Sequence, residues 1–167
     1  MFMSVILPAV YIIAIIVLDR ITKLWASSYL SNVGTIPIIQ DVLHLTYAEN
    51  TGMAFSLFSG KRFILVVLSI LAVIAIIWLL RQDYFDTALG KWAAYTVIGG
   101  AIGNLIDRIV YGFVVDMIDV RIINFAIFNV ADSFVCIGGG MFILYVILEW
   151  RRESKRKHNN DDTEARE

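Results

Sequence analysis

Four long apolar runs divide the chain. They cover residues 1–25, 63–80, 92–106 with its flanks, and 131–150. A helix needs about 20 largely apolar residues to cross the hydrocarbon core of a bilayer, and each run reaches or approaches this length. The run 63–80 contains no charged residue, whereas the first run is uninterrupted only from Val5 to Leu18 and ends with Asp19, Arg20 and Lys23. The pattern therefore predicts four transmembrane helices.

A shorter period appears in the connection 26–62. Two sets of side chains alternate there from Val42 to Tyr47, which is typical of a β-strand with two different faces. The connection 107–128 is also half apolar, so we expect it to rest on the bilayer surface. The expected fold class is an all-α membrane protein, a four-transmembrane-helix bundle with a small extracytoplasmic β-sheet.

Composition supports this interpretation and narrows the chemistry. Hydrophobic residues make up 59% of the 167 residues, charged residues make up 17%, and the mean hydropathy is +0.74, which lies outside the soluble globular range. We do not expect the first run to be a cleaved signal peptide, because no Lys or Arg precedes it and no small-x-small site follows it before Asp19. A single cysteine, Cys136, and two distant histidines predict neither a disulfide framework nor a metal site, and no cofactor is expected.

Positive charge is concentrated directly after the fourth run. The basic residues there are Arg151, Arg152, Lys155, Arg156 and Lys157, and such clusters favour the cytoplasmic side of a membrane. Four crossings then place both termini in the cytoplasm and the connections 26–62 and 107–128 outside it. We accordingly expect an integral membrane domain, residues 1–150, and a basic then polar cytoplasmic tail, residues 151–167, which is expected to be disordered.

Acidic residues gather at the predicted outer interface. The third run ends and the fourth begins with the pattern Asn-x-x-Asp, at Asn104 and at Asn129. An Asn followed by an acid three residues later resembles a helix-capping box, which is a sufficient explanation for a single acid. Ionisable side chains at membrane depth cost about 2.5–3.5 kcal/mol each on insertion scales, and several together usually mark function. The acids concerned are Asp107, Asp116, Asp119 and Asp132.

Two of these acids side by side would form a hydrolytic centre. Carboxylates about 4 Å apart repel by about 4 kcal/mol at an effective dielectric near 20, which separates their apparent pKa values by about 3 units. One then holds a proton while the other is ionised, as a general acid and a general base acting on one water require. Ser133 and Cys136 are weaker nucleophile candidates, because no His lies near them in sequence. The spacing leaves both Asp107 and Asp116 as partners for Asp132.

Other polar and small residues have structural interpretations. Asp19 and Lys23 stand four residues apart on one helical face, where they can form an ion pair. Arg108 can pair with Asp107 or orient a substrate carbonyl or a lipid headgroup, and the residues alone do not decide between these. The glycines of 99–103 and 138–140 allow helices to approach one another closely in a membrane.

Five motifs together resemble the lipoprotein signal peptidases, the bacterial signal peptidase II family. In chain order they are DRITK, NTGMAFS, GGAIGNLIDR, VVDMID and FNVAD. Each motif alone is a weak signal, but five in the family's order on four hydrophobic segments are a specific one. They run through most of residues 19–134, and NTGMAFS includes the turn-like Asn50 and Gly52.

The resemblance implies an aspartic endopeptidase that cuts diacylglyceryl-modified prolipoproteins just before the lipidated Cys, with Asp116 and Asp132 as the catalytic pair. It implies a bacterial cytoplasmic-membrane location and an active site at the extracytoplasmic face. The expected partners are the prolipoprotein and membrane lipids, with no nucleic acid, and we expect a monomer. Substrate-binding and supporting roles fall to Asn50, Gly52, Asn104, Arg108 and Asn129, and structural roles to Asp19, Lys23 and Asp107.

Two other functions would use some of the same features. A small proton-coupled transporter or channel subunit would distribute acids through the depth of the membrane, whereas here they gather at one surface and the run 63–80 has none. A structural scaffold would explain the glycine-rich helices but not the acids. Cleavage of a lipidated but not of an unlipidated precursor would separate the three.

Overall fold

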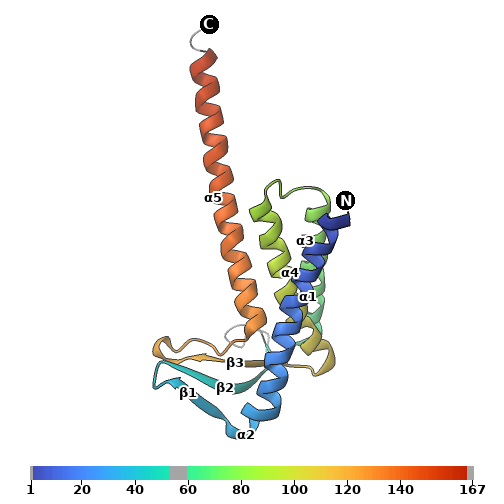
Figure 1. Cartoon of the computed structure of the whole chain (residues 1–167), viewed down its shortest axis with the longest axis vertical. Helices are drawn as coiled ribbons and strands as arrows, with labels where there is room; N and C mark the ends of the chain where they lie inside the picture. The colour runs from blue at the N-terminus through green and yellow to red at the C-terminus, as the bar shows by residue number, and fades with distance from the viewer. Residues whose placement is uncertain (1, 53–59, 165–167) are drawn as a thin grey trace.

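Four long helices dominate the computed structural model, which describes residues 2–52 and 60–164. Figure 1 shows them on one side of a small sheet. Each helix coincides with one of the four apolar runs. Part of the motif NTGMAFS falls on residues 53–59, which lie outside the described residues. The helices are α1 (Phe2–Trp25), α3 (Arg62–Arg81), α4 (Ala88–Val110) and α5 (Val130–Glu164).

A three-stranded antiparallel sheet lies across one end of these helices (Figure 1). Leu45 of the middle strand pairs with Ile36 on one side and with Ile118 on the other, and all three pack on a core that includes Ala26 and Leu30. The small sheet predicted from sequence is therefore confirmed. Its strands, in spatial order, are β1 (Thr35–Ile39), β2 (Leu43–Asn50) and β3 (Val114–Val120), and the segments beside them are the π-helix η1 (Ala26–Leu30), α2 (Ser31–Val33) and the 3-10 helix η3 (Arg121–Ile123).

The apolar residues of the second connection divide into two groups. Val115 and Met117 on β3 are each 3% exposed and belong to the core of the sheet, whereas Ile122 and Ile123 are 65% and 67% exposed. The expectation that the whole second connection rests on the bilayer therefore does not hold for Val115 and Met117. Strand alternation and pairing with β2 bury them instead.

Two described helices are long and apolar enough to cross a membrane. They are α3, over Arg62–Arg81, and the Val130–Lys157 part of α5. The other two long helices do not meet this criterion within the described residues. α1 collects three charged residues near its end, and α4 mixes glycine, tyrosine and asparagine with charged residues. The prediction of four transmembrane helices is therefore not confirmed by helix composition alone.

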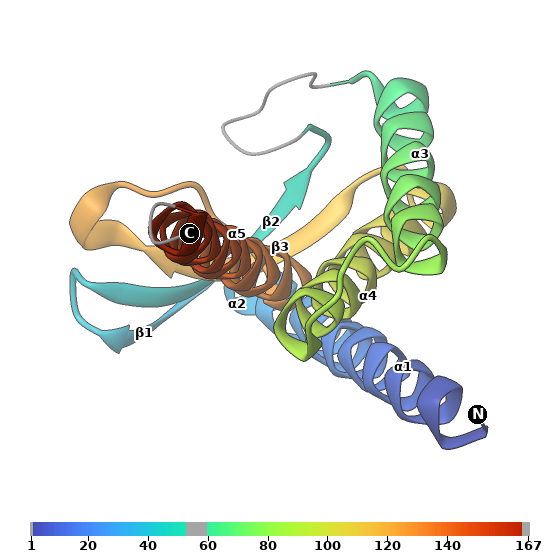
Figure 2. The same ribbon diagram turned by 90° about the horizontal axis from the view of Figure 1, so that it is seen from above.

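Helix α4 packs against α1, α3 and α5, and Figure 2 shows it between them. Glycines allow the closest approaches. A Cβ atom added at Gly103 would lie 2.8 Å from a carboxylate oxygen of α1, and one added at Gly138 would lie 2.7 Å from Cγ2 of Val97. A Cβ atom added at Gly139 or Gly140 would meet no heavy atom of another described element within 4 Å, so the expected packing role of 138–140 holds for Gly138 only.

Helix α4 ends later than its apolar run suggests. It continues to Val110, so Asp107 and Arg108 lie in its last turn and the second connection begins at Tyr111 instead of at residue 107. Both charged side chains are consequently held by a helix and not by a loop.

Helix α5 also continues past its apolar run. It extends through the basic segment to Glu164, so the expectation of a disordered tail does not hold for residues 151–164. Arginine, lysine and glutamate are good helix formers, and an ion pair between Glu149 and Arg152 spans the junction. The helix therefore propagates from the apolar segment into the charged one.

Candidate active site

Asp116 is the more deeply enclosed member of the predicted acid pair. It lies on β3, and the residue is 1% exposed. Its Oδ2 accepts a hydrogen bond from Nδ2 of Asn50 at 2.9 Å, and its Oδ1 accepts one from Nδ2 of Asn129 at 2.6 Å. Burial raises the pKa of Asp116 to about 6, and the negative charge of Asp132 adds to this rise. The two hydrogen bonds oppose the rise because they favour the ionised form.

Asp132 lies in the first turn of α5 and forms a capping box with Asn129. The backbone N–H of Asp132 donates to Oδ1 of Asn129 at 2.9 Å, and the backbone N–H of Asn129 donates to Oδ2 of Asp132 at 3.2 Å. The capping function indicated by the Asn-x-x-Asp pattern is thus present. It engages only one carboxylate oxygen, because Oδ1 of Asp132 accepts a hydrogen bond from Nδ2 of Asn104 at 2.6 Å.

Asn129 and Asn104 join the two acids into one network. Nδ2 of Asn129 donates to Asp116 and also, at 3.1 Å, to Oδ1 of Asn104. Asp116 and Asp132 therefore bind the same asparagine, one through its side chain and the other through its backbone and its side-chain oxygen. All four carboxylate oxygens accept N–H groups, so every oxygen of the ionised pair has a partner.

A buried ion cluster lies on α1 and α4 next to this network. Nζ of Lys23 is 2.8 Å from Oδ2 of Asp19 and 3.0 Å from Oδ2 of Asp107, and all three residues are at most 1% exposed. The predicted pair of Asp19 and Lys23 is therefore confirmed. Nζ of Lys23 also donates to Oδ1 of Asn104 at 2.9 Å, which links the cluster to the acids.

Asp107 is fully engaged within the ion cluster. Its Oδ1 accepts a hydrogen bond from Nη2 of Arg20 at 2.5 Å, and its Oδ2 accepts one from the backbone N–H of Val115 at 3.3 Å. Of the two candidate partners that the spacing left open for Asp132, the geometry thus joins Asp116, and not Asp107, to it through Asn129.

The turn after β2 is held by Asn50 and Arg108. Oδ1 of Asn50 accepts the backbone N–H of Gly52 at 2.9 Å, and the carbonyl oxygen of Gly52 accepts Nη2 of Arg108 at 3.0 Å. The turn predicted at Asn50 and Gly52 is confirmed. Within the described part of the chain, the buried Nε of Arg108 has no hydrogen-bond partner.

Asp119 lies apart from the acid pair in its contacts. It accepts hydrogen bonds from Oγ1 of Thr46 at 2.7 Å and from Nε of Arg121 at 2.8 Å. Burial acts to raise the pKa of Asp119, but these two hydrogen bonds and the positive charge of Arg121 lower it, and the net result is a pKa below the usual value. Asp116 and Asp119, three residues apart on β3, therefore have pKa values shifted in opposite directions.

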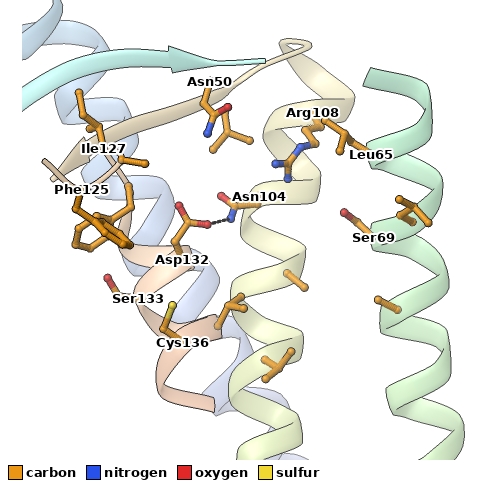
Figure 3. A pocket seen from close by; sticks show the side chains of 18 residues that line it. Asn50, Leu65, Ser69, Asn104, Arg108, Phe125, Ile127, Asp132, Ser133 and Cys136 are labelled. Carbon is orange, nitrogen blue, oxygen red and sulfur yellow. Dashed lines mark hydrogen bonds between the residues drawn. The ribbon is translucent and has the colours of Figure 1, made fainter. Parts of the chain in front are cut away.

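A cavity of about 710 Å³ opens between α3, α4 and α5. Figure 3 shows Asn50, Asn104, Arg108 and Asp132 at the end of the cavity nearest the sheet, with Cys136 farther along α5. Among the described residues, no group of three or more His, Cys, Asp or Glu side chains is placed to hold a metal ion. The remaining walls are mostly apolar and include Leu65, Leu68 and Ala72 of α3 with Val97 and Ala101 of α4.

Comparison with known proteins identifies the family. The family model for "Signal peptidase (SPase) II" matches residues 11–148, which is most of the chain. The chain belongs to the signal peptidase II family. Two curated relatives named "Lipoprotein signal peptidase" support this, one from Halothermothrix orenii and one from Clostridioides difficile. The first is 43% identical over 86% of this chain and 97% of that relative, and the second is 42% identical over 81% and 91%.

Two solved structures are similar in fold to this chain. A bacterial membrane enzyme determined by the in meso method at 2.3 Å resolution aligns with a TM-score of 0.79 and 27% identity, over 92% of each chain. A second such structure, at 1.9 Å resolution, aligns with a TM-score of 0.77 and 28% identity, over 85% of this chain and 93% of the other. The sheet across the helix ends is therefore part of a fold shared with other bacterial membrane enzymes.

Sequence reasoning missed two parts of this signal peptidase II site. Arg20 was not assigned to the site, although an unbalanced charge beside the predicted ion pair of α1 was an available signal. The wall contributed by α3 was also missed, since Leu65, Ser69 and Ala72 carry no pattern that distinguishes a cavity from a lipid contact.

Proposed function

We propose that this chain is a membrane-embedded aspartic endopeptidase that removes signal peptides from diacylglyceryl-modified prolipoproteins by cleaving just before the lipidated Cys. The relatives' name, lipoprotein signal peptidase, gives the substrate class. The observation that carries the proposal is that Asp116 and Asp132, from a strand and a helix, bind one asparagine, and that Asp132 lines the polar end of an apolar cavity. We refer to these two residues as the catalytic pair.

The two acids take different roles in the proposed mechanism. Asp132 lines the cavity, and each of its two carboxylate oxygens accepts an N–H group, so it is placed to act on a water in the cavity. Burial and the charge of Asp132 favour the protonated form of Asp116. Asp132 therefore takes a proton from water as the water oxygen attacks the carbonyl carbon, while Asp116 donates its proton to the carbonyl oxygen.

The second half of the reaction restores both acids. Asp132 gives its new proton to the leaving amide nitrogen as the C–N bond breaks. A hydroxyl of the tetrahedral intermediate returns a proton to Asp116, and a carboxylic acid forms.

The cavity suits a substrate that is mostly apolar. Its volume lies within the range of about 300–1,000 Å³ that is usual for ligand sites, and its polar groups are confined to one end. There, Arg108 lines the cavity, and its guanidinium group can bind a substrate carbonyl oxygen. The acyl chains and the signal peptide would lie along the apolar walls and in lipid, with the scissile bond at the pair.

We also propose that all four long helices cross the cytoplasmic membrane. The charged residues of α1 support this, because Asp19 and Lys23 are each 1% exposed and neutralise each other inside the protein. The basic segment 151–157 favours a cytoplasmic C-terminus, and Figure 1 places both termini at the end of the helices opposite the sheet. The pair then lies at the extracytoplasmic face of a domain formed by 1–150, followed by a cytoplasmic tail, 151–167. We further propose that the protein works as a monomer.

Substitution of the pair tests the proposal. Asp116→Asn and Asp132→Asn should each abolish cleavage of a diacylglyceryl-modified precursor by the purified protein in detergent, and both should remain inserted in membranes. Asp119→Asn, on the same strand but bound to Arg121, is the matched control and should retain cleavage. Processing by either variant of the pair, or equal cleavage of an unlipidated precursor, would contradict the proposal.

A further inference from the structure

The three asparagines around the catalytic pair have fixed amide orientations. Oδ1 of Asn50 accepts a backbone N–H two residues on, and Oδ1 of Asn129 accepts a backbone N–H three residues on. Oδ1 of Asn104 accepts Nζ of Lys23 at 2.9 Å. None of these three donors can act as an acceptor. Each amide must therefore turn its NH2 group away from the donor and toward a carboxylate.

Lys23 is the only one of these three donors that belongs to a side chain, and every proton of its ammonium group has an acceptor. Its three protons have three acceptors, which are Oδ2 of Asp19, Oδ2 of Asp107 and Oδ1 of Asn104, at 2.8, 3.0 and 2.9 Å. The residue is 1% exposed, so no water competes for these protons. Two anions hold the lysine, and the lysine in turn holds the amide.

We propose that Lys23 is a positioning residue that holds the Asn104 amide with its NH2 group toward Asp132, so that this carboxylate remains a hydrogen-bond acceptor. The inference rests on the proposed function, because it concerns the same pair. Without Lys23, the oxygen of Asn104 keeps only the longer hydrogen bond from Nδ2 of Asn129, at 3.1 Å, and loses its charged donor. The amide is then held less firmly against a turn of 180° that would present its oxygen to Asp132. Only a protonated carboxyl group can hydrogen-bond to that oxygen, and a protonated Asp132 is not a base.

Removal of the Asn104 donor shifts the ionisation of the pair in one direction. The charged groups that face the pair are Lys23 and Asp19 on α1 and Asp107 and Arg108 on α4. A hydrogen bond from an N–H to a carboxylate favours the ionised form. Its loss removes that support for the carboxylate, so the acidic limb of kcat/KM against pH moves to higher pH. The expected movement is about one unit or more.

The test compares Lys23→Met with Arg20→Met in detergent. Both variants remove one cation that binds Asp107, but only Lys23→Met removes the donor to Asn104. Lys23→Met is expected to lower kcat/KM at least about 10-fold on the acidic side and to approach the wild type on the alkaline side. Arg20→Met is expected to lose thermal stability while its acidic limb stays in place.

The position of the limb does not depend on how much of the protein is active. Lys23→Gln is the alternative variant if Lys23→Met does not fold. The NH2 group of glutamine lies one atom nearer the backbone than the ammonium group of lysine, and the same movement of the acidic limb to higher pH is expected. If the acidic limb of the Lys23 variant stays in place and the rate falls equally at all pH values, the role of Lys23 is merely structural and the inference is overturned. An equal movement in Arg20→Met assigns the effect to charge alone and also overturns it.

Failure of the proposed function gives a different result. Asp116→Asn and Asp132→Asn, assayed alongside, remain active if the pair is not catalytic. If both are inactive and only the limb of the Lys23 variant fails to move, the catalytic pair stands and the positioning role does not.

Discussion

Gly100 offers a test of how precisely α4 must lie against α5. A Cβ atom at this position would overlap the carbonyl oxygen of Ala131 and lie 2.8 Å from Cγ2 and 3.1 Å from the backbone nitrogen of Val135. Two of these three atoms belong to the backbone of the first turns of α5, which cannot rotate away. Gly100→Ala therefore has to push the two helices apart.

The size of the displacement follows from these contacts. Carbon contacts are ordinarily about 3.5–4.0 Å, so α5 has to move by roughly 1 Å. Asn104 lies one turn beyond Gly100 on the same face of α4, and its 2.6 Å hydrogen bond to Asp132 crosses the widened gap. Overpacking costs about 1–3 kcal/mol, and the helix propensity gained from Gly to Ala offsets about 1 kcal/mol of that.

We expect Gly100→Ala to lower kcat/KM by about 100-fold, the usual effect of a 1 Å misplacement of a catalytic group, with a small loss of thermal stability. The assay is cleavage of a fluorescent lipidated precursor peptide in detergent, with melting followed in parallel. Gly140→Ala is the matched control, since it gains the same propensity and has no neighbour within 4 Å; it should be as active as the wild type and at least as stable. Wild-type activity in Gly100→Ala would refute the reasoning that the helix contact sets the geometry of the pair.

Three further predictions concern individual polar groups. Because the pKa of Asp116 is raised to about 6, the folded state keeps a proton that the unfolded state releases near pH 4. The contribution of Asp116 to the free energy of unfolding of the wild type therefore falls as the pH rises from about 4 through 6. Asp116→Asn should remove this dependence and melt at a higher temperature than the wild type at pH 8, with the difference disappearing near pH 4. Asn50→Ala removes a donor to Asp116 and should lower kcat/KM at least about 10-fold, whereas Asn32→Ala, at an exposed residue bound to a backbone carbonyl, should not change it. Asp119 has a lowered pKa, so its stabilising contribution is present above about pH 4 and is lost below it; Asp119→Asn should be destabilised at pH 7, and the difference from the wild type should shrink below pH 4.

Local patterns predicted the parts of the structure that local chemistry determines. The run 63–80 predicted α3 because an uninterrupted apolar segment has few alternatives to a helix in lipid. Asn129 and Asp132 predicted a capped helix start because both partners of a capping box lie within one turn. The pair of Asp19 and Lys23 followed from helical spacing in the same way.

Long-range packing determined the parts that sequence did not predict. The hydrogen-bond network around the two acids depends on how β3 lies against α5. This packing places Asp116 beside Asn129, while Asp107 binds Lys23 and Arg20. The family resemblance was needed to choose Asp116, because the spacing allowed either acid. The helical tail was missed because a charged, aromatic-free composition predicts disorder, whereas a preceding helix supplies the turn on which further residues propagate.

One acid of the pair is attached to the sheet and the other to a helix, so the pair spans the junction between the sheet and the helices. Among the described residues, the hydrogen bonds across this junction include those between Phe128 and β3, from Asn129 to Asp116, from Arg108 to Gly52, and from Val115 to Asp107. Tilting of the helices relative to the sheet therefore acts directly on the spacing of the two carboxylates. Hydrophobic mismatch with the bilayer changes helix tilt, so bilayer thickness becomes a physical variable of the proposed cleavage rate. Lipids of different chain length provide a way to vary it without changing the protein.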